Sequence, residues 1–340
     1  MYLIHPGKKQ FKANLHSHST LSDGNLTPEE MKAAYKAKGY SVLCISDHER
    51  TNDFSHMTEP DFLMLTGYEA YIRPNYIYDF FGPEVHLNLL ARDPHNVSLV
   101  YFHPTSSRYL SDEQKAAVPK VGPLVERQYT TEFVNDFIRC AKDNGYIVTY
   151  NHPVWSLESQ ERIASYEGFC TMEICNWSSF NTGGCNEYNL DLYHKLLRSG
   201  KRVFAHSADD NHNKFPFDHV RCDSFGGAAM ILADKLEYDQ VFHAIETGEM
   251  YSTMGPVIHE VSFDGEQVHI SCSDAVQIAC YCGGKSAIIE KAQTGQVINK
   301  ASLTVRPGAL FVQISVTDKD GKRADTRGYF RDELGLPPVE

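Results

Sequence analysis

The sequence predicts an α/β protein that ends in a smaller all-β segment. Strand-like apolar runs alternate with helical patterns through the first three quarters of the chain, whereas short alternating runs without a helical period follow residue 255. A length of 340 residues is enough for about two domains. Hydrophobic residues make up 42% of the chain, and its 23 glycines complete a globular composition that excludes a disordered chain.

The first helix is predicted from its capping residues. Thr27 suits the N-cap, Pro28 suits the first helical position, and Glu30 completes a capping box. Gly39 supplies a C-terminal stop. A β-rich run, residues 41–46, follows directly and is the next expected strand.

The same order of elements recurs further along the chain. A helix over 131–144 ends at Gly145 before a strand over 146–150, and a helix over 190–199 ends at Gly200 before a strand over 202–206. A last helix spans about 236–247. Such repeats predict a parallel sheet with covering helices, as a barrel or as an open doubly wound sheet. No G-x-G-x-x-G follows the first strand, which disfavours dinucleotide binding.

The C-terminal segment has a different pattern. Strands are expected over 268–272, 276–282, 302–305 and 311–317, separated by Asp-Gly, Gly-Gly and Pro-Gly turns. These runs predict a sandwich-like unit of about five to seven strands. The expected domains are therefore residues 1–254 and residues 255–340.

Charge and composition limit the classes of partner. The chain has 32 basic and 44 acidic residues, a net charge of −12, and no basic face for long nucleic acids. No apolar stretch of about 18 residues and no secretory signal are present, so we expect a cytoplasmic protein that begins near Met1 and does not enter a membrane. The nine cysteines show no C-x-x-C pair and no partner for a cysteine nucleophile. The oligomeric state is not predicted.

Histidines and carboxylates gather at the ends of the predicted strands. They are His16, His18, Asp23, Asp47, His48, Glu69, His86, His152, Asp210 and His212. The two histidines of the H-x-H motif would point the same way from an extended strand. In a parallel barrel, the carboxyl ends of the strands carry the active site.

Each of these residues also has an ordinary structural interpretation. H-x-H alone is a weak signal, His86 could be a core histidine, Asp23 a turn residue and Asp210 a helix N-cap. A common role in metal binding explains all of these positions at once, whereas separate structural roles would require many coincidences at strand ends. Imidazole and carboxylate without thiolate suit zinc, manganese or iron. Six histidines and three carboxylates exceed the needs of one ion, so two or three divalent metal ions are expected.

The motifs NLHSHSTLSDG, SDHE, GYE, VHLNLL, NHP and DDNH resemble, in order, those of the PHP (polymerase and histidinol phosphatase) family of metal-dependent hydrolases. The resemblance covers about residues 12–250 and implies a distorted (β/α)7 barrel. FGGAAMILAD, AIETGEMYSTMGP and ISVTDKDGKRA are similar to a branch with a C-terminal β domain. That branch is usually described as predicted phosphoesterases and also resembles carbaryl-hydrolase-like metallohydrolases.

The resemblance implies three sets of ligands. The first is His16, His18, Glu69 and Asp210, the second Glu69, His86 and His152, and the third Asp23, His48 and His212. Some members have histidine in place of Asp23, which makes the third site the most variable. Glu69, Asp210 and His212 would be catalytic through the metals they hold, and His103 is an alternative to His86. Asp47 and Asp209 could orient ligands.

The implied activity is hydrolysis of a small phosphate monoester or diester. Ions bridged by Glu69 would lower the pKa of a bridging water, and the resulting hydroxide would attack phosphorus. Arg50, Arg73 and Lys214 could grip the substrate or be structural. Two other functions stay open, hydrolysis of a carbamate, ester or amide at the same site and a non-catalytic metal-loaded binding protein.

Three more residues have two interpretations each. Glu173 ends a predicted strand on the active face and either contacts the site or is structural. Trp155 and Trp177 follow strands and either line a substrate pocket or pack against the wall.

Overall fold

The structure of the protein is a computed structural model, and the residues that it describes are 1–74 and 81–338. The α-helices are α1 (Pro28–Ala37), α2 (Asp112–Ala117), α3 (Thr131–Asp143), α4 (Gln160–Ser165), α5 (Trp177–Asn181), α6 (Leu190–Arg198) and α7 (Tyr238–Thr247), and a 3-10 turn, η1, spans Ser55–Met57. The strands up to α7 are β1 (Tyr2–Ile4), β2 (Lys9–Asn14), β3 (Val42–Ile45), β4 (Leu63–Ile72), β5 (Val85–Ala91), β6 (Leu99–Val100), β7 (Lys120–Val121), β8 (Tyr146–Tyr150), β9 (Thr171–Asn176), β10 (Phe204–Ala208) and β11 (Ala228–Ala233). The strands after it are β12 (Met250–Thr253), β13 (Ile258–Phe263), β14 (Gln267–Ala275), β15 (Gln277–Tyr281), β16 (Ile288–Lys291), β17 (Ile298–Thr304), β18 (Phe311–Thr317), β19 (Arg323–Thr326) and β20 (Tyr329–Phe330).

The predicted helices are confirmed with boundaries that differ by at most two residues. At the start of α1, the Thr27 side chain accepts from the Glu30 amide at 3.2 Å, and the Glu30 carboxylate accepts from the Thr27 amide at 2.9 Å. This reciprocal pair satisfies two amides that the helix itself leaves free. Gly248 follows α7 with a φ of 72°, the left-handed conformation that ends a helix.

A large mixed sheet runs through the protein in the order β10-β9-β8-β5-β4-β3-β2-β11-β12-β19-β18-β15-β16. The pairs β2–β3, β3–β4, β8–β9 and β9–β10 are parallel, as predicted. The prediction is wrong for β5, which is antiparallel to both β4 and β8. β4 ends at Ile72 and β5 begins beside it, where Val85 pairs with Ile72, whereas a parallel neighbour would need a crossover to the other end of β4.

The last strand of the α/β part begins later than expected. Residues 202–206 were predicted, but β10 spans Phe204–Ala208 because its ladder with β9 starts where Phe204 pairs with Thr171. This shift carries the polar residues after β10 to the sheet edge at which β2 also ends. There Ser17 and Asn211 form an isolated parallel bridge.

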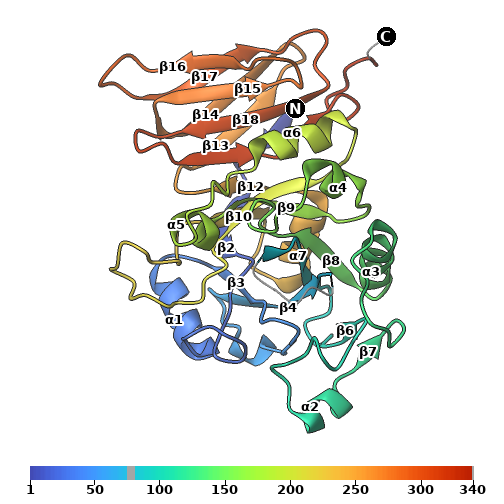
Figure 1. Cartoon of the computed structure of the whole chain (residues 1–340). Helices are drawn as coiled ribbons and strands as arrows, with labels where there is room; N and C mark the ends of the chain where they lie inside the picture. Colours follow the sequence, from blue (N-terminus) through green and yellow to red (C-terminus); the bar gives the residue numbers. More distant parts are fainter. Residues whose placement is uncertain (75–80, 339–340) are drawn as a thin grey trace.

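The C-terminal part is all β, as predicted. Between residue 254 and residue 338 the structure contains strands β13–β20 and no helix, one strand more than the largest number expected. β13, β14 and β17 form a sheet with β1 from the N-terminus, while β15, β16, β18 and β19 continue the large sheet through β12. Figure 1 shows these strands gathered above the α/β part, with the N-terminus beside them. The boundary between residues 254 and 255 stays a prediction.

Helices α3 and α7 pack against strands of the large sheet. Val134, Phe137 and Ile138 on α3 are fully buried, and α3 packs against β8. α7 packs in the same way against β11. The longest described helix, α3, has 13 residues, and none of the helices in the described ranges is long and apolar enough to cross a bilayer.

Candidate metal centre

The structure brings all nine predicted ligand residues together. His16 and His18 follow β2, Asp23 lies in the next turn, His48 follows β3, Glu69 lies within β4, His86 begins β5, His152 follows β8, and Asp210 and His212 follow β10. His86, predicted to lie within a strand, reaches the cluster from the amino end of β5, because β5 runs antiparallel to its neighbours.

Glu69 is the hub of the cluster. Its Oε1 lies 3.0 Å from His86 Nδ1, 3.2 Å from His152 Nε2 and 3.3 Å from His16 Nε2. Its Oε2 lies 2.9 Å from His48 Nδ1. The Glu69 side chain is only 1% exposed, so its two oxygens face these histidines rather than solvent. A carboxylate so placed can bridge more than one cation.

His16, His18 and Asp210 face one another beside Glu69. The Nε2 atoms of the two histidines are 3.1 Å apart, and Asp210 Oδ1 lies 3.1 Å from the first and 3.0 Å from the second. The His16 ring donates from Nδ1 to the Glu173 carboxylate at 2.7 Å, which leaves its Nε2 lone pair directed into the cluster when the ring is neutral.

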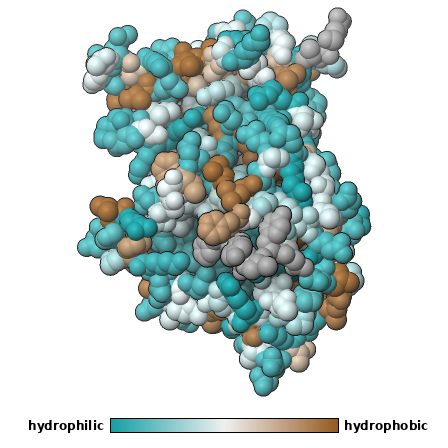
Figure 2. All heavy atoms as spheres, in the orientation of Figure 1, coloured by the Kyte–Doolittle hydropathy of each residue, from teal (hydrophilic) through white to brown (hydrophobic). Residues whose placement is uncertain are grey.

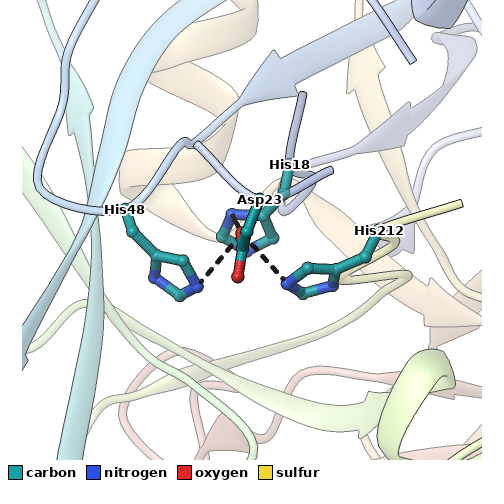
Figure 3. Close-up of side chains that lie close together, drawn as sticks. All are labelled: His18, Asp23, His48 and His212. Atoms are coloured by element: carbon teal, nitrogen blue, oxygen red, sulfur yellow. Dashed lines mark ion pairs between the residues drawn. The ribbon is translucent and has the colours of Figure 1, made fainter. Parts of the chain in front are cut away.

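A third group surrounds Asp23. Asp23 Oδ1 lies 3.4 Å from His212 Nε2 and 3.6 Å from His48 Nε2, with His18 Nδ1 at 4.0 Å. Figure 3 shows the rings of His48 and His212 pointing toward the Asp23 carboxylate from two sides, with the His18 ring beside it. His18 therefore lies between this group and the one around Asp210.

Three overlapping groups have the spacing of a metal site, with ligand atoms within 4.8 Å of one another. They are His18, Asp23, His48 and His212; His16, His18 and Glu69; and His48, Glu69 and His86. These groups are close to the predicted sets, but they add His18 to the third set and His48 to the second, and they leave out Asp210 of the first set and His152 of the second. The overlap arises because His18, His48 and Glu69 each stand between two groups.

The electrostatics of the cluster fit cations. Burial lowers the pKa of His86, but the charges and hydrogen bonds of Glu69 and Glu84 together outweigh burial and raise it to about 10. Burial opposes protonation of His16 too, yet the charges of Asp210, Glu69 and Glu173 raise the pKa of this histidine well above its usual value. The buried carboxylates therefore stabilise positive charge in the cluster. Divalent cations can supply that charge in place of protons. Imidazole and carboxylate donors without thiolate are ligands of such cations.

His18 gives a second reason to expect a bound cation. Burial, with His48 and His212 nearby, lowers the pKa of His18 to about 3, so this ring is neutral. Its Nδ1 is buried and has no hydrogen-bond partner among the described residues. A buried nitrogen without a partner costs free energy that a metal ion at the Asp23 group would recover.

Glu173 contacts the site but stands behind it. Its Oε1 accepts from His16 Nδ1, and its Oε2 accepts from the His152 amide at 2.8 Å and from Asn176 Nδ2 at 2.9 Å. The side chain is fully buried. Of the two interpretations of this residue, the geometry supports contact with the site, because one carboxylate orients a ligand ring and the backbone of another ligand.

Other carboxylates hold the loops that carry ligands. Asp47 accepts from the Ser19 amide and hydroxyl, both at 2.8 Å, and from the Ser22 hydroxyl at 2.6 Å, so it fixes the turn before Asp23 rather than a histidine ring. Asp209 accepts from Tyr35 and from the amides of residues 225–227. Asp223, which sequence reasoning missed, accepts from the His212 amide at 2.8 Å.

The predicted substrate-gripping residues have different surroundings. The Arg50 guanidinium donates to the backbone oxygens of Leu21 and Tyr109 and so joins two loops. Arg73 lies over the Tyr71 ring at 5.2 Å. Lys214 is exposed two residues beyond His212. The alternative ligand His103 bonds to Thr105 and is not in any of the three metal-type groups.

Of the two tryptophans, Trp155 touches the ligands and Trp177 does not. The Trp155 ring centroid is 4.8 Å from that of His152 and 5.1 Å from that of His86. Trp177 donates to the Cys222 carbonyl oxygen and stacks on Phe180.

A cavity of about 820 Å³ lies elsewhere, at the amino ends of β8, β9 and β10, lined by Tyr146, Cys170 and Phe204 among others. It is therefore separate from the ligand cluster.

Comparison with known proteins gives a family match for the first part of the chain. Residues 14–152 match the family model of the PHP domain. The matched range holds seven of the nine predicted ligands, all except Asp210 and His212. The sequence has no match among curated proteins.

Solved structures similar to this chain include three with 15 or 16% identity. A two-domain protein from Bacteroides vulgatus ATCC 8482, said to contain a predicted PHP-like metal-dependent phosphoesterase, is 15% identical, with a TM-score of 0.45 over 95% of this chain and 96% of that one. A protein of Bifidobacterium adolescentis ATCC 15703, provisionally called a metal-dependent phosphoesterase, is 16% identical, with a TM-score of 0.40 over 70% and 96%. An amidohydrolase from Chromobacterium violaceum, with bound sulfate and no metal, is 16% identical, with a TM-score of 0.39 over 59% and 87%.

Proposed function

We propose that this protein is a metal-dependent phosphoesterase that hydrolyses a small phosphate monoester or diester. The observation that carries the proposal is the set of three overlapping ligand groups joined through His18, His48 and the buried carboxylate of Glu69. Such a set can hold two or three divalent ions, and zinc, manganese and iron suit its ligands. The match to the PHP family model over residues 14–152 supports the same class of chemistry.

The number of ligand groups favours a phosphoryl group over a carboxylic ester. A phosphoryl group presents several charged oxygens, so adjacent cations can each bind one, whereas an ester carbonyl presents a single oxygen. When bound, the cations would neutralise the phosphoryl oxygens and acidify the attacking water. The net charge of −12 disfavours long nucleic acids, which leaves small phosphorylated compounds as the proposed substrates.

Exposure of the ligands indicates the side from which the substrate enters. The side chains of Asp23, His48 and His212 are 33%, 15% and 16% exposed, whereas His16 is fully buried. We therefore place the phosphate against the Asp23 group and the metal bridge at Glu69 beneath it. Asp210 and His212 act, in this proposal, by holding the ions.

The surrounding residues position this machinery. Asn151 donates to Glu69 Oε1 at 2.7 Å and keeps that carboxylate in place between its histidines. We assign substrate contact to Lys214 and Arg73. Arg50 is assigned to anchoring the loops over the Asp23 group, because its donors already meet backbone oxygens.

A finer description of the fold belongs to the same proposal. We propose that the strands from β2 to β10 form a distorted (β/α)7 barrel, supported by the Ser17–Asn211 bridge between its first and last strands. We also propose a sandwich-like C-terminal unit. Residues of both of its sheets, such as Val261 and Ile314, belong to one apolar core, which supports this arrangement.

The proposal is tested by assaying the metal-reconstituted protein with Mn²⁺ or Zn²⁺ against phosphomonoesters, phosphodiesters, carboxylic esters and carbamates. We expect hydrolysis of at least one phosphate ester, measured as alcohol release, abolished in Asp210→Asn and unaffected in Asp264→Asn, a surface carboxylate of the C-terminal part. Cleavage of carboxylic esters or carbamates alone would mean that the site attacks carbon, and the phosphoesterase assignment would be wrong.

A further inference from the structure

The loop after the ligand His152 presents large apolar side chains to solvent. Val154, Trp155 and Leu157 are 42%, 38% and 60% exposed. Scattered single apolar residues are common on protein surfaces, but a contiguous group beside a reactive centre is typical of a binding site. The sequence left open whether Trp155 lines a pocket or packs against the wall, and these exposures favour the first interpretation.

Trp155 borders the metal cluster directly. Its ring meets the rings of His152 and His86 edge to face, at interplanar angles of 76° and 60°. Those two histidines lie within 3.2 Å of Glu69 Oε1. The organic part of an ester whose phosphate is bound at the cluster would therefore extend over or beside this indole.

The loop backbone is held in place from behind. The buried carboxylate of Glu187 accepts from the amides of Val154 and Trp155, at 2.9 and 2.8 Å. The Ser156 carbonyl oxygen accepts from the Glu84 amide at 3.0 Å. A fixed backbone presents the three apolar side chains without a large entropy cost on binding.

The same loop carries backbone strain. His152 and Leu157, at its two ends, have φ values of 24° and 56°, in the region that L-residues rarely adopt. Strained conformations persist where the surrounding structure enforces them, and they cluster at functional sites. A segment kept in this conformation with its apolar side chains exposed is better explained by a ligand than by packing.

We propose that Val154, Trp155 and Leu157 form an apolar subsite for the organic group of the substrate, so that esters of aromatic alcohols are preferred over esters of small or hydroxylated alcohols. This inference rests on the proposed phosphoesterase function and names its substrate class. The flat indole offers an edge or a face to an aromatic ring. Sugar or glycerol hydroxyls would lose water against these side chains and gain no hydrogen bonds from them.

The subsite is tested with benzyl phosphate and ethyl phosphate on the metal-loaded enzyme. Both release a primary alcohol, so their chemical reactivity is similar and kcat/KM reports binding of the organic group. We expect kcat/KM about 10- to 100-fold higher for benzyl phosphate, the range for one apolar group in a pocket. Trp155→Ala should bring the ratio within about threefold, and Trp155→Phe should keep most of it. Ile289→Ala, at an exposed apolar residue on β16, should leave the ratio unchanged.

A binding measurement separates failure of the subsite from failure of the function. Tryptophan fluorescence of the metal-loaded protein is titrated with benzylphosphonate and with ethylphosphonate. Both carry the organic group on phosphorus through carbon, so neither has an ester bond that the enzyme can hydrolyse. Binding of the benzyl compound about tenfold more tightly, with an emission change that Trp155→Phe removes, supports the subsite even when no ester is cleaved. Equal dissociation constants overturn it. Cleavage of both esters at equal kcat/KM would leave the phosphoesterase standing and also overturn the subsite.

Discussion

Glu173→Gln tests whether the buried carboxylate behind His16 contributes to metal binding. The substitution keeps the size of the side chain and removes one negative charge, 2.7 Å from His16 Nδ1. Adding the width of the imidazole ring and a metal–nitrogen bond of ~2.1 Å places that charge about 7 Å from a cation at Nε2. At an effective dielectric constant of about 20, this distance gives about 2.4 kcal/mol for each unit of charge on the cation, or about 4.7 kcal/mol for a divalent ion.

The expected loss of metal affinity is smaller than this Coulomb figure, because the glutamine amide oxygen can still accept the hydrogen bond from His16 Nδ1 and orient the ring. Carboxylates that orient ligating histidines typically contribute 10- to 100-fold, or about 1.4–2.7 kcal/mol. We therefore expect the dissociation constant of the most tightly bound ion to rise by about 10- to 100-fold in Glu173→Gln. Competition with a chromophoric chelator at fixed pH measures this change.

A matched control separates this effect from the loss of any buried carboxylate. Glu158 is also buried and accepts from the hydroxyls of Tyr129, Tyr150 and Tyr166, with no ligand histidine among these partners. Glu158→Gln should leave the metal affinity unchanged. A folded Glu173→Gln protein whose dissociation constant stays within twofold of the parent would refute the positioning role.

Three further predictions follow from individual interactions. Asp23→Asn should lower the metal content of the fully loaded protein by one ion per chain, measured by elemental analysis, because Asp23 is the carboxylate of the most exposed ligand group; an unchanged content would contradict this grouping. Glu49→Gln should lower the free energy of unfolding by about 3–5 kcal/mol in denaturant titrations, because it leaves the buried Arg127 guanidinium without its carboxylate. A loss below 1 kcal/mol would count against a buried ion pair. Burial lowers the pKa of His194 below its usual 6.5, so the unfolded chain binds the proton more readily and stability should fall as pH drops below about 6.5. The melting temperature of His194→Gln should fall less between pH 7 and pH 5.5 than that of the parent, and equal falls would contradict the assignment.

The sequence predicts the local elements well where they depend on local chemistry. The capping box of Thr27 and Glu30 and the helix stop at Gly248 depend on residues within a few positions, and both occur as expected. Strand direction is not local. Nothing in the residues of β5 distinguishes a parallel from an antiparallel neighbour, so its reversal, and with it the approach of His86 from the amino end, was not predictable.

Most residues of the cluster were recognisable in the sequence because they lie at the ends of strands or just after them, although Glu69 lies within β4 and His86 lies at the amino end of β5. The residues that support them lack such a pattern. Glu173 reaches His16 across 157 positions of sequence, and Glu187 reaches Val154 across 33. Only the folded chain brings these partners together, which is why the role of Glu173 stayed open and Glu187 was missed.

The pairing of β1 with β13 is a further example of a long-range contact. Residues 2–4 join a sheet formed by the C-terminal part, and Phe263 donates its amide to the Met1 carbonyl oxygen at 2.8 Å. A three-residue strand has too little pattern to reveal its partner. The two ends of the chain are therefore connected in a way that composition and periodicity do not indicate.

The most direct test of the metal centre is elemental analysis of the purified, metal-reconstituted protein beside His16→Ala and Glu69→Gln. The proposed centre predicts two or three divalent ions per chain in the parent and a marked loss in both variants, since Glu69 lies within 3.3 Å of three histidine nitrogens through one oxygen. Full metal content in both folded variants would contradict the centre and, with it, the function built on it.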